Sequence, residues 1–153
     1  MLSVRHFPFL SRGQLGWSWK GDASRTDFQD PSADASYLLC IYDSSGQSQP
    51  RMALAVPAGG SCGTRPCWRA GTSGFRYGDP LRTPDGVSAV QLKAGGRIVL
   101  KGKGENLGLA LLVYELAPKI TLQLFRTGAG TCWQADFSSL TSAGSGDFTA
   151  GSD

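Results

Sequence analysis

Glycine and proline divide this chain into short segments, and that division constrains the fold more than any other feature. The 153 residues include 21 glycines and 8 prolines, and the longest stretch without either runs over residues 32–45. Within the segments apolar and polar residues alternate, most clearly in residues 87–93 and 97–101 on either side of Gly95-Gly96. Alternation interrupted by glycine turns is typical of short antiparallel strands. The pattern argues strongly against helical and parallel α/β folds, and against the active sites that those folds carry.

The alternating segments predict an all-β, two-sheet antiparallel β-sandwich of about 8–10 short strands, with a β-barrel as the alternative. The expected strands cover residues 14–20, 36–43, 51–56, 67–70, 74–78, 87–93, 97–101, 120–125, 131–137 and 147–150. Residues 36–43 are apolar on both faces, which indicates a central strand. Residues 107–116 are expected to be extended, with room for one helical turn.

One domain of residues 14–150 is expected, preceded by a disordered lead of residues 1–13 and followed by a frayed tail of residues 151–153. A composition of 41% hydrophobic and 18% charged residues is typical of a globular protein. The longest apolar run, residues 107–114, is far shorter than the roughly 20 residues of a spanning helix. We therefore expect no membrane span.

Four cysteines allow three disulfide pairings. Cys62 and Cys67 lie close together in a loop that contains glycine and proline, so we predict a Cys62–Cys67 bridge with Cys40–Cys132 as the second pair. Disulfides of this kind favour an oxidising compartment. The alternative is four free thiols, two of them serving as small buried apolar residues.

The sequence lacks the residues of several common active sites. Its single histidine, His6, falls in the expected lead, so neither a Ser-His-Asp nor a Cys-His arrangement can form inside the domain. The cysteine spacing does not fit a zinc ribbon, and Lys101-Gly-Lys-Gly104 lacks the end of a phosphate-binding loop. Asp27, Asp30 and Asp34 could bind Ca²⁺, but turn formation explains them as well. We expect no catalytic residue, no metal and no cofactor.

The four tryptophans are the best indication of a binding role, because an exposed indole can stack on a sugar. Core packing explains most of them, and Trp68 is the exception that we predict to bind a ligand, because its segment is short and loop-like. The basic set Lys93, Arg97, Lys101 and Lys103 is interpreted as a solvated face that protects the hairpin from edge pairing. A net charge of +3 is too small to indicate a nucleic-acid partner.

Several motifs occur in a fixed order that resembles a known module. They are residues 34–43 (DASYLLCIYD), 62–68 (CGTRPCW), 74–77 (GFRY), 84–93 (PDGVSAVQLK), 100–104 (LKGKG) and 132–133 (CW). The set resembles a C-terminal β module of uncharacterised, secreted bacterial proteins, and the resemblance covers most of residues 15–150. That module has no established activity, so the resemblance implies no catalytic residue. It implies an extracellular or cell-surface location, as part of a larger exported protein.

These observations favour a non-catalytic extracellular structural or binding module, with a carbohydrate, a cell surface or another domain of a larger parent protein as the partner. The alternative is a carboxylate-dependent hydrolase such as a glycosidase. Two carboxylates facing each other across a groove would favour the hydrolase. An exposed aromatic platform would favour the binding module.

Overall fold

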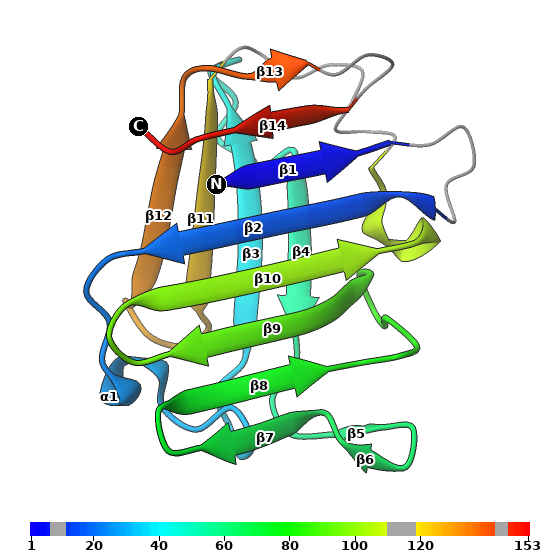
Figure 1. Ribbon diagram of the computed structural model, residues 1–153, viewed down its shortest axis with the longest axis vertical. Coiled ribbons are helices and arrows are strands. Elements are labelled where there is room, and N and C mark those ends of the chain that lie inside the picture. The colour runs from blue at the N-terminus through cyan, green and yellow to red at the C-terminus, as the bar shows by residue number, and fades with distance from the viewer. Residues whose placement is uncertain (7–11, 110–118, 143–146) are drawn as a thin grey trace.

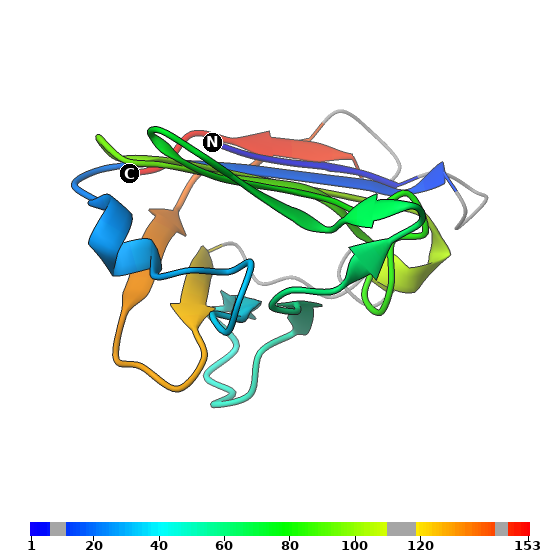
Figure 2. The ribbon, with the colours of Figure 1, turned by 90° about the horizontal axis from the view of Figure 1, so that it is seen from below.

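The computed structural model describes residues 1–6, 12–109, 119–142 and 147–153, which fold as an all-β sandwich. A larger sheet of eight antiparallel strands forms one layer and a smaller sheet of four forms the other (Figure 2). Helix α1 (Arg25–Phe28) lies on the same side of the larger sheet as the smaller sheet. The predicted two-sheet sandwich is confirmed.

The larger sheet joins strands from both ends of the chain (Figure 1). Its spatial order is β13 (Thr141–Ser142), β14 (Phe148–Ala150), β1 (Leu2–Arg5), β2 (Gln14–Lys20), β10 (Arg97–Lys103), β9 (Val87–Lys93), β8 (Gly74–Gly78) and β7 (Trp68–Gly71). The hairpin of β9 and β10 therefore lies in the middle of this sheet, between β8 and β2. The interpretation of its basic residues as edge protection is wrong, because neither strand is an edge.

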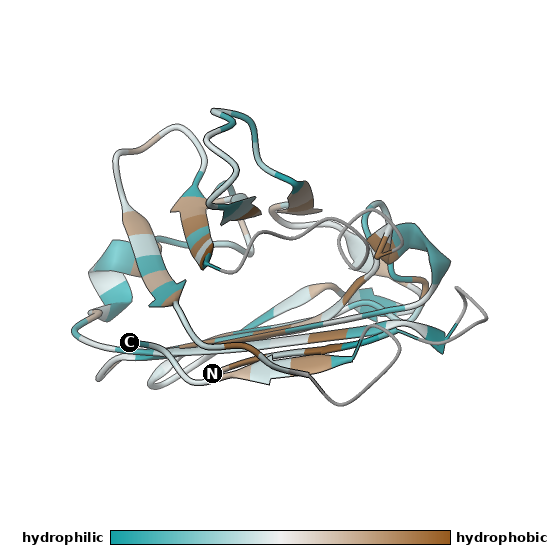
Figure 3. Cartoon of the chain, turned by 90° about the horizontal axis from the view of Figure 1, so that it is seen from above, coloured by the Kyte–Doolittle hydropathy of each residue, from teal (hydrophilic) through white to brown (hydrophobic). Residues whose placement is uncertain are grey.

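The smaller sheet has the order β12 (Cys132–Phe137), β11 (Ile120–Arg126), β3 (Tyr37–Asp43) and β4 (Met52–Val56). Strand β3 is central, as its two apolar faces predict. Apolar and polar residues alternate along most of β11 and β12, whereas β4 is apolar throughout (Figure 3). A separate two-stranded ladder pairs β5 (Ser61–Cys62) with β6 (Arg65–Pro66).

A cluster of aromatic rings fills the space between the layers. Tyr37 lies between Trp68 and Trp133, with ring centroids 5.7 Å and 6.4 Å away. Phe28 of α1 packs on Trp133 at 5.4 Å, and its carbonyl accepts a 2.6 Å hydrogen bond from the Tyr37 hydroxyl. Helix α1 begins at a capping box, in which Ser24 and Asp27 bond each other's backbone amides. One helical turn thereby fixes the aromatic side chain that enters the core.

The expected lead is corrected by the structure. Residues 2–5 form β1, which pairs with both β2 and β14 and buries Leu2 and Val4. Residues 7–11 of that segment lie outside the described residues, and the Gly13 carbonyl accepts from the Gly104 amide at 2.9 Å. Asp153 in the expected frayed tail bonds the Asp136 carbonyl at 3.0 Å and accepts from Ser138 at 2.6 Å.

The region expected to be extended near residue 107 begins with a helical turn. Residues Glu105–Leu107 form a single 3-10 turn, η2, which buries Leu107. Residues 110–118 lie outside the described residues, so the rest of that prediction is not tested.

Candidate functional site

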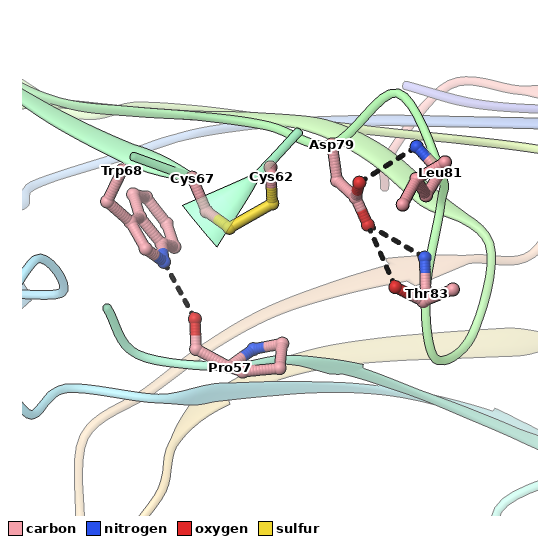
Figure 4. The surroundings of a disulfide bond; sticks show 7 residues. All are labelled: Pro57, Cys62, Cys67, Trp68, Asp79, Leu81 and Thr83. Atoms are coloured by element: carbon pink, nitrogen blue, oxygen red, sulfur yellow. Dashed lines mark hydrogen bonds between the residues drawn. A yellow bond between two sulfur atoms is a disulfide. The ribbon is translucent and has the colours of Figure 1, made fainter. Parts of the chain in front are cut away.

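The loop that carries β5 and β6 is closed by a disulfide bond between Cys62 and Cys67, whose Cα atoms are 4.8 Å apart (Figure 4). The Cys67 amide donates to the Gly60 carbonyl at 3.1 Å, and the Cys67 carbonyl accepts from the Gly78 amide at 2.9 Å. The bridge therefore ties the loop to the β7 edge of the larger sheet. This half of the disulfide prediction is confirmed.

Trp68 does not form a surface platform, so its predicted role in ligand binding is corrected. It is 2% exposed, its ring lies 5.1 Å from that of Tyr77, and its indole N–H donates to the Pro57 carbonyl at 2.8 Å. The alternation of β7 directs Trp68 inward and Arg69 outward, as Figure 4 shows for the indole. Of the two neighbours, Arg69 is the one available to a ligand.

The predicted Cys40–Cys132 disulfide is wrong: both cysteines are free, with Cys40 buried and Cys132 exposed. Strand β11 separates them, since Cys40 pairs with Gln123 and Cys132 with Phe125. Two strand spacings of about 4.8 Å each exceed the roughly 7 Å Cα separation that a disulfide tolerates. Burial raises the pKa of the Cys40 thiol, which favours the protonated form over the thiolate.

A tight loop after β8 is organised by Asp79, which is 3% exposed. Its carboxylate accepts from the amides of Leu81 at 2.9 Å and Thr83 at 2.7 Å, and from the Thr83 hydroxyl at 3.3 Å (Figure 4). Three bonds offset the cost of burying the charge. Arg82, inside this loop, has a φ of 58° and its carbonyl accepts from Asn106 at 3.1 Å. The loop therefore holds Arg82 in a defined position.

The disulfide loop and the Asp79 loop form the walls of a groove of about 700 Å³ at the end of the larger sheet. We call it the basic groove, because four cationic side chains line it: Arg65, Arg69, Arg82 and Lys103. Arg65 lies on β6, Arg69 on β7 and Lys103 at the end of β10. Among the described residues the lining contains one carboxylate, Asp79, which accepts three hydrogen bonds within its own loop. The groove is suited to bind a negatively charged group.

Sequence reasoning found Lys103 but not the three arginines. Arg65 and Arg82 lie in loops whose positions depend on the disulfide and on Asp79. Arg69 was overlooked beside Trp68. The alternation of tryptophan and arginine at 68–69 is a signal that could have indicated which of the two faces solvent.

A second depression, of about 730 Å³, is lined by Trp19, Lys20, Gln134, Asp136 and Asp153. The indole N–H of Trp19 donates to the Gln134 carbonyl at 2.9 Å. Asp136 accepts from the Thr121 hydroxyl at 2.6 Å. Hydrogen bonds from Ser138 lower the pKa of Asp153. The bonds from Ser138 therefore favour the charged form of the Asp153 carboxyl.

Two of the three acidic residues that could have bound Ca²⁺, Asp27 and Asp30, have structural partners. Asp27 accepts from the Ser24 amide at 2.7 Å, and Asp30 from the Ser32 amide at 2.9 Å. These bonds from Ser24 and Ser32 lower the pKa of each carboxyl. Among the described residues no group of three or more His, Cys, Asp or Glu side chains is placed to hold a metal ion. In the same part of the chain, no helix has the length and apolarity to cross a membrane.

The groove thus offers a concentrated positive charge. The geometry suits recognition of an anion by arginine forks, which match the oxygens of sulfate, phosphate and carboxylate groups. Compared with known proteins, the chain matches no family model, no curated protein and no solved structure.

Proposed function

We propose that this chain is a non-catalytic binding module that holds an anionic group of its ligand in the basic groove. The observation that supports this proposal is the imbalance of charge there, four cationic side chains against one internally bonded carboxylate. Cations that converge on a groove repel one another, and an anionic ligand relieves that repulsion. A carbohydrate that carries sulfate, phosphate or carboxylate groups, at a cell surface or in a matrix, fits this chemistry.

The Cys62–Cys67 bridge supports an extracellular setting for this module. Disulfides persist in secreted proteins and are reduced in most cytosols. The bridge also positions β6, which carries Arg65. An oxidising compartment that keeps the disulfide intact therefore also keeps this wall of the basic groove in place. A place within a larger exported protein is the further implication of the motif resemblance.

A carboxylate-dependent hydrolase is the alternative, and Asp136 and Asp153 in the depression beside Trp19 are its best candidates. A glycosidase needs one carboxyl whose pKa is raised so that it can donate a proton near neutral pH. The hydrogen bonds from Ser138 act on Asp153 in the opposite direction. The binding module is therefore the better proposal.

The test is a titration of the labelled protein with galactose 6-sulfate, followed by the backbone amide signals in NMR. We expect shifts confined to the groove, at residues such as Gly63, Arg69 and Gly78, and no comparable shifts with neutral galactose. Lys103→Gln should weaken binding about threefold to tenfold. Lys119→Gln is the matched control, because Lys119 is exposed and does not line the basic groove. Shifts spread over both sheets, or equal losses in the two variants, would contradict the proposal.

A further inference from the structure

We infer that the basic groove is one end of a longer cationic surface, and that the ligand is a linear anionic polysaccharide lying across the strands of the larger sheet. The inference rests on the proposed function and deepens it, because it names the class of polymer and the residues that bind it outside the groove.

The first observation concerns the charges carried by the eight strands of the larger sheet. No aspartate or glutamate lies in any of these strands. Every lysine and arginine in them is exposed, and strand alternation places all of them on the face turned away from the smaller sheet. We call this outer face the cationic face; its charged residues are Arg5, Lys20, Arg69, Arg76, Lys93, Arg97, Lys101 and Lys103.

The second observation is that like charges lie directly opposite one another on neighbouring strands. Arg97 pairs with Lys20 on one side and with Lys93 on the other. Arg69 pairs with Arg76. Directly opposed like charges destabilise a sheet, and within the described part of the chain none of these five residues forms an ion pair with a carboxylate. The two strands of the hairpin are central, so protection of an edge does not account for the charges.

The third observation is that the groove continues onto the cationic face. A depression of about 520 Å³ is lined by Arg5, Lys101 and Lys103 above a floor that includes Ser3 and Gly16. It shares Ser88 and Lys103 with the basic groove. A Cβ atom on Gly16 would lie 2.8 Å from the Ser3 hydroxyl, so the absence of a side chain at Gly16 leaves space in this depression. A polymer that leaves the groove therefore meets further cations along an open path.

The residues between the cations indicate which polyanion fits. Val99 is the largest apolar side chain among the outward positions of β1, β2, β7, β8, β9 and β10, and none of these positions is aromatic. Single-stranded nucleic acids bind through aromatic stacking, and membrane-surface proteins insert large apolar residues. The face instead offers hydroxyl and amide groups, on Ser18, Gln14 and Gln91, that suit the hydroxyls of a sugar chain.

Sulfated oligosaccharides derived from heparin test the inference by their length. We expect a dodecasaccharide to bind at least about tenfold more tightly than a tetrasaccharide in calorimetry, because it reaches more cations than the groove provides. The logarithm of its affinity should fall linearly with the logarithm of salt concentration, as for other polyelectrolytes.

Arg97→Gln is the decisive variant, because Arg97 does not line the basic groove. We expect it to weaken dodecasaccharide binding at least threefold and to reduce the salt slope by about one. It should leave the affinity for galactose 6-sulfate unchanged, and it should keep or raise the melting temperature, since it removes two like-charge contacts. The control Lys119→Gln makes the same change in net charge and should alter none of these quantities.

The possible outcomes separate the two proposals. Equal affinities for short and long oligosaccharides, together with no effect of Arg97→Gln, would show that the cationic face does not bind the polymer. Binding of galactose 6-sulfate in the same experiments would still support the basic groove as a binding site. If longer oligosaccharides bind more tightly but galactose 6-sulfate does not bind in the basic groove, the proposed function is wrong instead. A DNA duplex, or vesicles of anionic phospholipid, that bind more tightly than the dodecasaccharide through Arg97 would overturn the choice of polysaccharide.

Discussion

Trp68 lies where the core meets the disulfide loop, and a substitution there has a defined cost. Replacing a buried indole by alanine leaves a large cavity, so we expect Trp68→Ala to lower the free energy of unfolding by about 3–5 kcal/mol. Trp68→Phe keeps most of the packing and loses the bond to Pro57, for a smaller cost of about 1–2 kcal/mol. Urea denaturation followed by circular dichroism measures both. Equal costs would show that the hydrogen bond, not the ring, is what stabilises the site.

Because Tyr77 lies on the inner side of β8, we expect the free energy of unfolding to fall at alkaline pH. Burial, together with the nearby Asp79 carboxylate, raises the pKa of Tyr77 to about 12 from its ordinary value of 10.0. The folded state therefore keeps the neutral phenol while the unfolded chain ionises. The stability is fully present below pH 10 and is lost as pH rises toward 12, by about 2–3 kcal/mol for this group. Tyr77→Phe should flatten the fall between those values in urea unfolding measured across alkaline pH.

The β9–β10 turn contains two glycines in the left-handed region that play different roles. A Cβ atom on Gly96 would lie 1.4 Å from the Gly21 carbonyl oxygen, whereas one on Gly95 would meet nothing within 4 Å. Their φ angles are alike, 87° and 85°. We expect Gly95→Ala to cost about 1 kcal/mol for the backbone conformation alone. Gly96→Ala should cost at least about 2 kcal/mol more, in thermal or urea unfolding, and similar costs would contradict the close approach.

Loss of the Cys62–Cys67 disulfide should affect the basic groove more than the rest of the fold. Replacing Cys62 and Cys67 by serine removes a loop constraint worth about 2 kcal/mol and frees the strand that carries Arg65. We expect the melting temperature to fall and galactose 6-sulfate binding to weaken, with the far-UV circular dichroism spectrum retained. Cys132→Ser is the control, because Cys132 forms no disulfide. Unchanged sulfate binding in the double variant would separate the groove from the bridge.

Elements with a local pattern could be predicted from the sequence, and elements defined by distant partners could not. Residues 14–20, 74–78 and 87–93 form strands with the predicted limits, because alternation and glycine turns determine them locally. The sequence did not predict strand β1. This strand is held by backbone pairing with β2 and β14, and the four residues of β1 alone do not identify those partners. The two-residue strands β5, β6 and β13 are too short to show any period.

At the scale of the whole molecule, the first strand contributes to stability. Leu2 and Val4 are buried, and β1 fills the position between β14 and β2. Removing residues 1–6 should lower the free energy of unfolding by about 3–6 kcal/mol, from the lost apolar burial. The chain lacking these residues should melt at a lower temperature in calorimetry. An unchanged melting temperature would restore the interpretation of this segment as a disordered lead.

The candidate site is also a property of the whole molecule. The basic groove combines β6, β7, β10 and a loop, and each contributes one cation. Sequence analysis could identify the basic residues of the β9–β10 hairpin. It could not show that they share a face with Arg5, Arg69 and Arg76, because the register between distant strands decides that.

The pairing of the first and last strands has a consequence for how the chain can be rewired. Leu2 lies opposite Ala150, and the two ends of the chain lie close together (Figure 1). A short peptide could therefore join the ends, and new ends could be opened at Gly46, in an exposed turn where even an added Cβ would meet nothing within 4 Å. Such a circular permutant would fold to the same sandwich, and the same geometry would let the module be inserted into a loop of a host protein with its cationic face left open.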